Sequence, residues 1–135
     1  MGIKNFIGVF SRDTLPDQIG NNVSLIINTD KAAGQGKHWT CIYTDPKQDY
    51  VYYFDSYGGK PNKETLKYLK TSNKQIVYSS NPIQAYNTFL CGYFCAFFII
   101  MMYRGMEPYD ITYRFGLRNE KGNDDLLIKS IIQAL

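Results

Sequence analysis

The longest apolar run of the chain, residues 89–103, constrains the fold more than any other feature. It follows a polar loop, and Gly105, a residue type common at helix ends, lies just beyond it. Gly92 interrupts the run, which is too short for a comfortable membrane span. The pattern therefore predicts a buried core helix from about Leu90 to Arg104, against which the other elements pack.

The segments ahead of this helix are rich in β-forming residues and are separated by turns. Strands are expected at residues 23–28, 38–44, 49–55 and 75–78, and further helices at residues 62–70 and 124–134. Strands that cluster ahead of a central helix are typical of the α+β class. We therefore expect a mixed or antiparallel sheet packed on the apolar helix.

Length and composition fit one globular domain spanning residues 1–135, with 44% hydrophobic and 20% charged residues. No apolar leader follows Met1, so we expect a protein that is not secreted and has no membrane partner. Three cysteines are too few for a disulfide scaffold, which favours a reducing compartment. A single histidine and the lack of a Cys-x-x-Cys pair argue against zinc, so no metal site is expected.

Cys91 lies where the polar loop meets the predicted core helix. Free backbone N–H groups and the helix dipole favour a thiolate at such a position, and the thiolate is the nucleophilic form. His38, the only histidine, begins one predicted strand, and Asp55 ends the next. One cysteine, one histidine and one acid make up the inventory of a thiol hydrolase. The alternatives are a buried structural cysteine for Cys91 and a simple strand-end cap for Asp55.

The turn at residues 45–48 offers a second link between His38 and Asp55. If this turn is a four-residue hairpin loop, Thr44 pairs with Asp49 and His38 pairs with Asp55. The register alone would then place the imidazole beside the carboxylate. A slip of one residue would remove the pairing.

The ordered set His38-Trp39, Asp55, Gln84 and Cys91-Gly92 resembles the adenovirus proteases (adenains) and their relatives, the SUMO-specific and other ubiquitin-like proteases. The most specific segment is Gln84-x-x-Asn87-x-x-x-Cys91-Gly92-x-Phe94-Cys95, whose spacing is similar to that of adenain at each named residue. The resemblance covers most of the chain, including residues 6–13, the strand ending at residue 29, and residues 53–58, in the same order.

The resemblance implies a catalytic triad in which Cys91 is the nucleophile, His38 the general base and then acid, and Asp55 the residue that orients His38. Adenain has glutamate at the third position, whereas aspartate is similar to the ubiquitin-like proteases. The resemblance also implies that the Gln84 side chain and the Cys91 backbone N–H form an oxyanion hole. Trp39 is expected to shield the ion pair formed by the Cys91 thiolate and the protonated His38, or to line the substrate groove.

The implied activity is that of a cysteine endopeptidase that cleaves viral capsid and core precursors at Gly-rich sites during virion maturation. Such a protein would act in the virion and in the host cell. One alternative is a protease that removes ubiquitin or SUMO; another, of a different class, is an inactive DNA- or capsid-binding module. No cofactor is expected, although the resemblance leaves room for activation by DNA or a peptide. A disulfide-linked peptide is not expected, because Cys41 and Cys95 lie in a predicted strand and helix.

Five lysines recur between residues 60 and 74 at alternating steps of three and four: Lys60, Lys63, Lys67, Lys70 and Lys74. On a helix this spacing forms one basic stripe opposite Leu66 and Leu69. Glu64 is the only acid in the segment, whose net charge is +4 against +3 for the whole chain. Such concentrated charge is typical of a non-specific DNA-binding surface, but Lys-rich solvated helix faces are ordinary, and no Arg or aromatic platform accompanies this stripe, so the solvated face is the favoured interpretation.

Overall fold

The computed structural model of the protein describes residues 2–34, 38–78, 81–84, 90–115 and 120–134. Its strands are β1 (Phe6–Ser11), β2 (Ser24–Asn28), β3 (Trp39–Thr44), β4 (Tyr50–Phe54) and β5 (Gln75–Tyr78). Its helices are α1 (Lys63–Lys70), α2 (Cys91–Tyr103), α3 (Pro108–Tyr113) and α4 (Glu120–Ala134). The predicted α+β class is confirmed.

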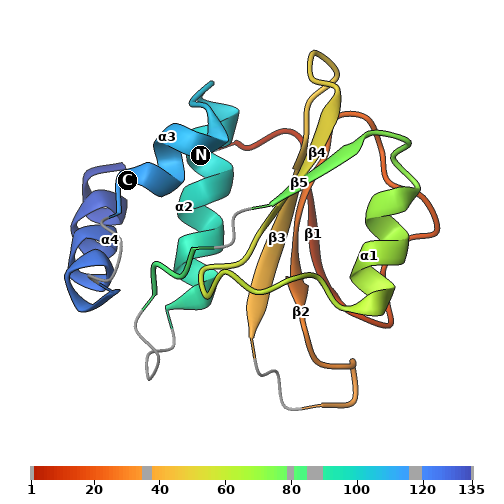
Figure 1. Ribbon diagram of the computed structural model, residues 1–135, viewed down its shortest axis with the longest axis horizontal. Helices are drawn as coiled ribbons and strands as arrows, with labels where there is room; N and C mark the ends of the chain where they lie inside the picture. Colours follow the sequence, from red (N-terminus) through yellow and green to blue (C-terminus); the bar gives the residue numbers. More distant parts are fainter. Residues whose placement is uncertain (1, 35–37, 79–80, 85–89, 116–119, 135) are drawn as a thin grey trace.

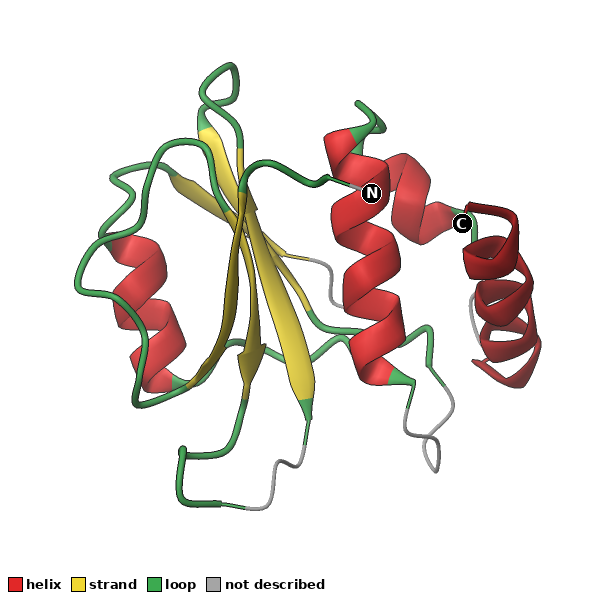
Figure 2. Ribbon diagram, turned by 180° about the vertical axis from the view of Figure 1, so that it is seen from behind, coloured by secondary structure: helices red, strands yellow, loops and turns green. Residues whose placement is uncertain are grey.

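The five strands form one mixed sheet in the order β1-β2-β3-β4-β5. The two outer pairs, β1 with β2 and β4 with β5, are parallel, and the inner pairs are antiparallel. Helix α1 covers one face of the sheet, while α2, backed by α3 and α4, covers the other (Figure 1). The view from behind shows the same three layers (Figure 2). The sheet therefore has a hydrophobic cluster on each face.

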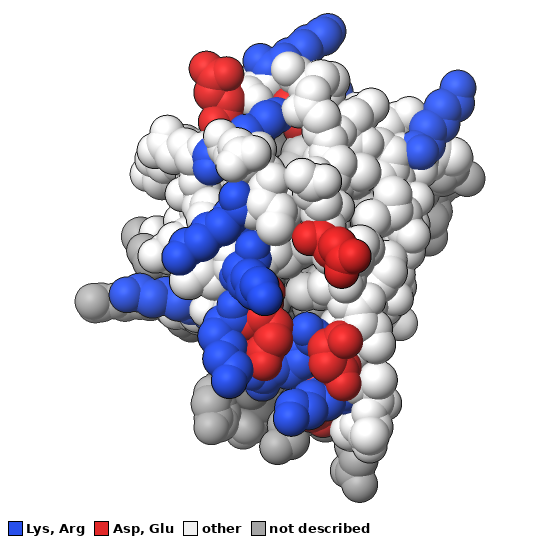
Figure 3. Space-filling view, turned by 90° about the vertical axis from the view of Figure 1, so that its right-hand side faces the viewer, with Lys and Arg blue, Asp and Glu red and all other residues white. Residues whose placement is uncertain are grey.

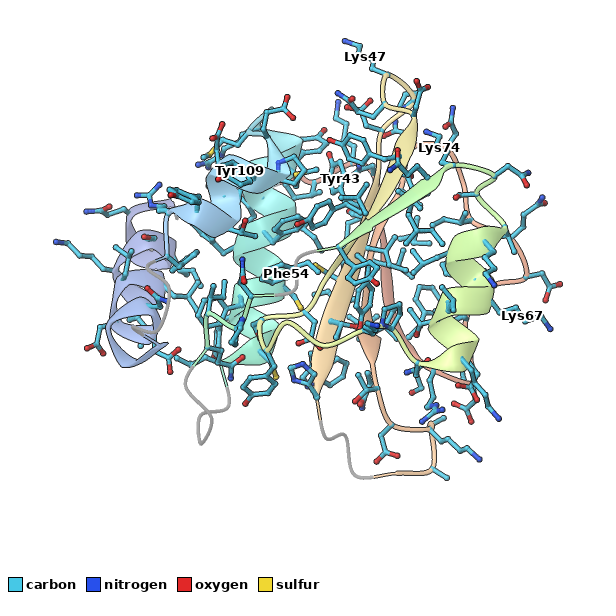
Figure 4. All side chains as sticks on the ribbon, viewed as in Figure 1. Tyr43, Lys47, Phe54, Lys67, Lys74 and Tyr109 are labelled. Carbon is cyan, nitrogen blue, oxygen red and sulfur yellow. The ribbon has the colours of Figure 1, made fainter. Side chains whose placement is uncertain are left out.

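Helix α2 is apolar around its whole circumference. This pattern fits its position, because it packs on the sheet on one side and on α3 and α4 on the other. Toward the sheet, Phe98 stacks on Phe54 and Tyr52, with ring centroids 4.6 and 5.1 Å apart. Figure 4 shows Phe54 pointing from β4 into the space between the sheet and α2. On its other side, Phe94 and Phe97 meet the edge of Phe115, which follows α3. None of the helices in the described ranges is long and apolar enough to cross a membrane.

Helix α1 has the amphipathic pattern that its sequence predicts. Tyr68 and Leu69 are buried against the sheet, whereas the lysines of the helix are exposed. Asn62 caps the N-terminus, since its side chain accepts a hydrogen bond from the backbone N–H of Thr65 at 2.9 Å. The helix ends at Lys70, and Asn73, three residues later, has a positive φ of 57°.

The predicted hairpin register is wrong by two residues. Thr44 pairs with Val51 rather than Asp49, and Cys41 pairs with Phe54. The turn itself forms as expected, with the Gln48 N–H donating to the Asp45 carbonyl at 3.0 Å. A shift of two leaves every side chain on its predicted face, because strand side chains alternate with a period of two.

Candidate active site

The predicted site residues come from elements that meet at one end of the sheet. His38 immediately precedes β3, Asp55 immediately follows β4, and Cys91 is the first residue of α2. Because β3 and β4 are antiparallel, the start of one lies beside the end of the other. Figure 1 shows the first turn of α2 at this same end of the molecule.

His38 and Asp55 are in direct contact. The His38 Nε2 atom lies 2.6 Å from Asp55 Oδ1, and both side chains are largely buried. The Tyr57 backbone N–H also donates to Oδ1 at 2.8 Å, so the carboxylate is held by its own turn. The turn closes tightly at Gly59, where an added Cβ would lie 2.8 Å from Asp55 Oδ2. The position of the Asp55 carboxylate is therefore set by its own turn as well as by its contact with the imidazole.

The second ring nitrogen of His38 is left for Cys91. Nδ1 is buried and makes no close hydrogen bond within the part of the chain that the structure describes. Burial alone would lower the pKa of His38, but its interactions with Asp55 and Cys91 outweigh burial and raise the pKa to about 9. The imidazole is therefore a cation near neutral pH, oriented by a carboxylate.

Cys91 has the opposite shift. Burial alone would raise the pKa of its thiol, but the His38 side chain and the backbone N–H groups of Trp39 and Gly92 lower it below its ordinary value. The position at the start of α2 explains part of this, since N–H groups at a helix N-terminus favour an anion. Cys91 and His38 thus favour each other's charged forms.

Trp39 lies over the first turn of α2. A Cβ placed on Gly92 would be 3.9 Å from Trp39 Cδ1, which is ordinary van der Waals contact. The Trp39 backbone carbonyl lies 3.4 Å from the Cys95 Sγ atom, which tethers the start of β3 to α2. Trp39 is half-buried, next to the first turn of the helix that Cys91 begins.

Gln84 is held at the turn that also carries Asp55. Its backbone N–H donates to the Ser56 carbonyl at 3.1 Å. Its side-chain Oε1 accepts from Ser56 Oγ at 2.5 Å, and its Nε2 donates to the Tyr57 hydroxyl at 3.2 Å. The side chain is 1% exposed. Asn87, the other polar residue of the matched loop, lies outside the described residues.

Tyr57 is a site residue that the sequence analysis did not single out. Its ring stacks on the His38 imidazole with centroids 4.6 Å apart and an interplanar angle of 27°. In sequence it lies before Gly58, within the segment 53–58 that resembles adenain, but that resemblance assigns it no role and its spacing gives none.

Cys41 and Cys95 are fully buried free thiols in the core, as predicted. Neither is accessible to a partner chain. Among the residues that are described, no group of three or more His, Cys, Asp or Glu side chains is placed to hold a metal ion.

The predicted stripe of five lysines is only partly helical. Lys63, Lys67 and Lys70 lie on α1, but Lys60 precedes the helix and Lys74 follows it. Lys74 Nζ donates instead to the Asp45 carbonyl at 3.0 Å. The helix has the bounds expected to within one residue, but the lysine spacing continues past both of its ends, so only three of the five lysines share a helix face.

The basic side chains of α1 lie on the side of the sheet away from α2. Figure 3, which views the molecule from the α1 side, shows them interspersed with acidic residues. One such acid, Glu64, forms a salt bridge with Arg12 at 2.6 Å. The lysines and the Cys91 region therefore occupy different surfaces.

Comparisons with known proteins give viral relatives. The chain is 32% identical over 111 residues to R355 of Acanthamoeba polyphaga mimivirus, which is named as a candidate thiol protease; the match covers 73% of this chain and 35% of R355. It is 30% identical over 94 residues to the protease of bovine adenovirus 7, covering 58% of this chain and 46% of that protease. No protein-family model matches the sequence.

Among solved structures, the African swine fever virus protease pS273R has the same fold, with a TM-score of 0.57 at 21% identity. The superposition covers 74% of this chain and 41% of pS273R. The chain thus spans about a third to a half of the length of the proteins that it matches.

Proposed function

The chain is related by sequence and fold to the adenain-like viral cysteine proteases, and we propose that it is itself a cysteine endopeptidase. One observation carries the proposal. Cys91, at the N-terminus of α2, has a lowered pKa and is coupled to His38, whose other ring nitrogen is bonded to Asp55. A thiol, a base and an orienting acid in this order are the working parts of a thiol hydrolase.

In the proposed mechanism, the Cys91 thiolate attacks the carbonyl carbon of the scissile peptide bond. The backbone N–H of Cys91 and the Gln84 amide stabilise the negative charge that develops on the carbonyl oxygen. His38 then donates its proton to the leaving amine, which breaks the peptide bond and leaves an acyl-enzyme. In the second half, neutral His38 takes a proton from a water molecule whose oxygen attacks the thioester carbonyl. The C–S bond then breaks, which releases the product acid and restores the Cys91 thiolate and the protonated His38. Asp55 keeps the imidazole in its orientation throughout.

We further propose that the substrates are capsid and core precursor proteins, cleaved at Gly-rich sites during virion maturation. The viral origin of the relatives supports this choice, and it would place the protein in the virion and the host cell. The alternative substrates are conjugates of ubiquitin or SUMO.

The proposed chemistry needs no cofactor. The complete burial of Cys41 and Cys95 supports the view that a disulfide-linked peptide does not activate the protein. Activation by DNA or by a non-covalent peptide is compatible with the same site.

Active-site labelling tests the proposal directly. A peptide vinyl sulfone ending in glycine should modify the folded protein at Cys91, as mapped by mass spectrometry. Cys91→Ala should abolish both labelling and hydrolysis while leaving the melting temperature close to that of the wild type. Modification first at Cys41 or Cys95, or hydrolysis that persists in Cys91→Ala, would contradict the assignment. Absence of labelling in the wild type would favour the inactive binding module.

A substrate panel separates the two protease hypotheses. Capsid-precursor peptides with Gly-rich sites should be cleaved with a higher kcat/KM than ubiquitin or SUMO conjugates. In the same assay, Gln84→Ala should lower kcat by about 10²–10³ with little change in KM, as expected for the loss of one oxyanion donor. A pure increase in KM would make Gln84 a ground-state substrate contact instead.

A further inference from the structure

Tyr57 touches three other residues of the candidate site at once. Its backbone N–H donates to Asp55 Oδ1, its ring stacks on His38, and its hydroxyl accepts a hydrogen bond from Gln84 Nε2. It thereby joins the His38–Asp55 pair to the amide expected to form the oxyanion hole. We propose that Tyr57 is a positioning residue with two separable tasks: its ring fixes the plane of His38, and its hydroxyl fixes the orientation of the Gln84 amide. The second task rests on the proposed function.

The ring has a task because one hydrogen bond does not fix an imidazole. The Nε2 contact with Asp55 anchors one ring atom but permits rotation about the axis through it. The face of Tyr57, 4.6 Å away and inclined by 27°, opposes that rotation. With the plane fixed, Nδ1 stays toward the Cys91 thiol, whose pKa depends on His38. A small rotation would weaken this coupling, and errors of that size are costly in catalysis.

The hydroxyl has a task because a single hydrogen bond does not fix the plane of a carboxamide. Ser56 Oγ donates to Gln84 Oε1, and the Tyr57 hydroxyl oxygen accepts from Nε2, so both ends of the amide are held and its plane is set. Without the Tyr57 hydroxyl, the Gln84 amide nitrogen would lose this fixed partner inside a nearly solvent-free site. Tyr57 therefore keeps the donor end of Gln84 on the side of the His38 ring.

Two substitutions separate the tasks. Tyr57→Phe keeps the ring and removes the hydroxyl, whereas Tyr57→Leu removes both. Tyr113→Phe is the matched control, because Tyr113 is a 69% exposed tyrosine on α3. For each variant we would measure the pH dependence of Cys91 alkylation by iodoacetamide, the side-chain amide resonance of Gln84 by ¹⁵N NMR, and peptide hydrolysis.

Tyr57→Phe should alkylate with the wild-type pH profile. Its Gln84 resonance should shift, and kcat should fall by about tenfold to a hundredfold at constant KM, because the oxyanion donor is misplaced rather than lost. Tyr57→Leu should in addition move the alkylation profile to higher pH. Tyr113→Phe should match the wild type in all three measurements.

An unchanged alkylation profile in Tyr57→Leu would overturn the ring's task. An unmoved Gln84 resonance in Tyr57→Phe would overturn the hydroxyl's task. Neither readout depends on proteolysis. If the wild type hydrolyses no peptide while both readouts respond as expected, the proposed function fails and the positioning role of Tyr57 stands.

Discussion

Cys91 and His38 each have a pKa that depends on the charge of the other. Burial acts against both charges, and each residue overcomes it through the other and through fixed groups: Asp55 for His38, and the backbone N–H groups of Trp39 and Gly92 for Cys91. The thiolate–imidazolium pair is therefore the favoured state between the lowered pKa of Cys91 and the pKa of about 9 of His38.

The pH dependence of the site follows from these directions. As pH rises through the lowered pKa of Cys91, the thiolate forms, and iodoacetamide should react well below the pH that an ordinary thiol needs. As pH rises further through about 9, His38 loses the proton that it must donate to the leaving amine, so hydrolysis should decline. Alkylation rates and kcat/KM measured from pH 5 to 10 check both the rise in thiol reactivity and the decline in hydrolysis.

His38→Ala supplies the control for the pH at which the Cys91 thiolate forms. Without the imidazolium, burial dominates, and the alkylation profile of Cys91 should move to higher pH. Cys95 serves as an internal reference, because complete burial raises its pKa and it should stay unmodified in the folded protein. A wild-type Cys91 that reacts only at the pH of a free thiol would show that the pair does not form.

At the scale of elements, the contact between α2 and β4 holds the helix that carries Cys91, the proposed nucleophile, against the sheet. Phe98 is 1% exposed and stacks on both Phe54 and Tyr52. Phe98→Ala should lower the free energy of unfolding by about 3–5 kcal/mol, as measured by urea denaturation, because it leaves a cavity in the core. Tyr93→Ala, on the same helix but 58% exposed, should cost much less. Equal losses would contradict the packing role of Phe98, because alanine raises helix propensity at both positions.

The elements that position the nucleophile and its partners could be predicted from sequence because their signals are local. The apolar run gave α2 to within one residue at each end, and strand composition gave β2 to β5 closely. The edge strand β1 and the short helix α3 were not predicted. In β1, Gly8 has a φ of 131° and the register is irregular, so no clean alternation marks it. Helix α3 has six residues, too few for a periodic pattern.

The site was predictable only in part, because some of its contacts follow from strand order and others depend on how a turn folds. The proximity of His38 and Asp55 followed from strand order, and a register error of two residues preserved their common face. The role of Tyr57 depends on how a turn folds back over an imidazole, which no spacing in the sequence encodes. The lysine stripe was drawn beyond the helix expected at residues 62–70, because the steps of three and four continue to Lys60 and Lys74, which lie outside α1.

At the scale of the whole molecule, the sheet separates two chemically different surfaces. The candidate active site lies at the end of the sheet where α2 begins, whereas the lysines of α1 lie over the opposite face (Figure 1). Figure 4 shows Lys67 pointing away from the sheet. A polyanion bound along α1 would thus leave the site around Cys91 open. Attachment to DNA, if it occurs, would raise the local concentration of the protein near its substrates without entering the chemistry.

DNA binding by α1 stays a prediction, and its salt dependence tests it. If Lys63, Lys67 and Lys70 each contact a phosphate, the log–log slope of affinity against salt should be about −2.7, at roughly −0.9 per contact. Changing Lys63 and Lys67 to Gln should reduce the magnitude of that slope by nearly two. Lys74→Gln should leave it unchanged, because Lys74 Nζ is hydrogen-bonded to the Asp45 backbone carbonyl. Hydrolysis of a short peptide without DNA should be the same in all variants. If duplex DNA does not bind at low salt, or if the substitutions leave the salt slope unchanged, the lysines of α1 are an ordinary solvated helix face.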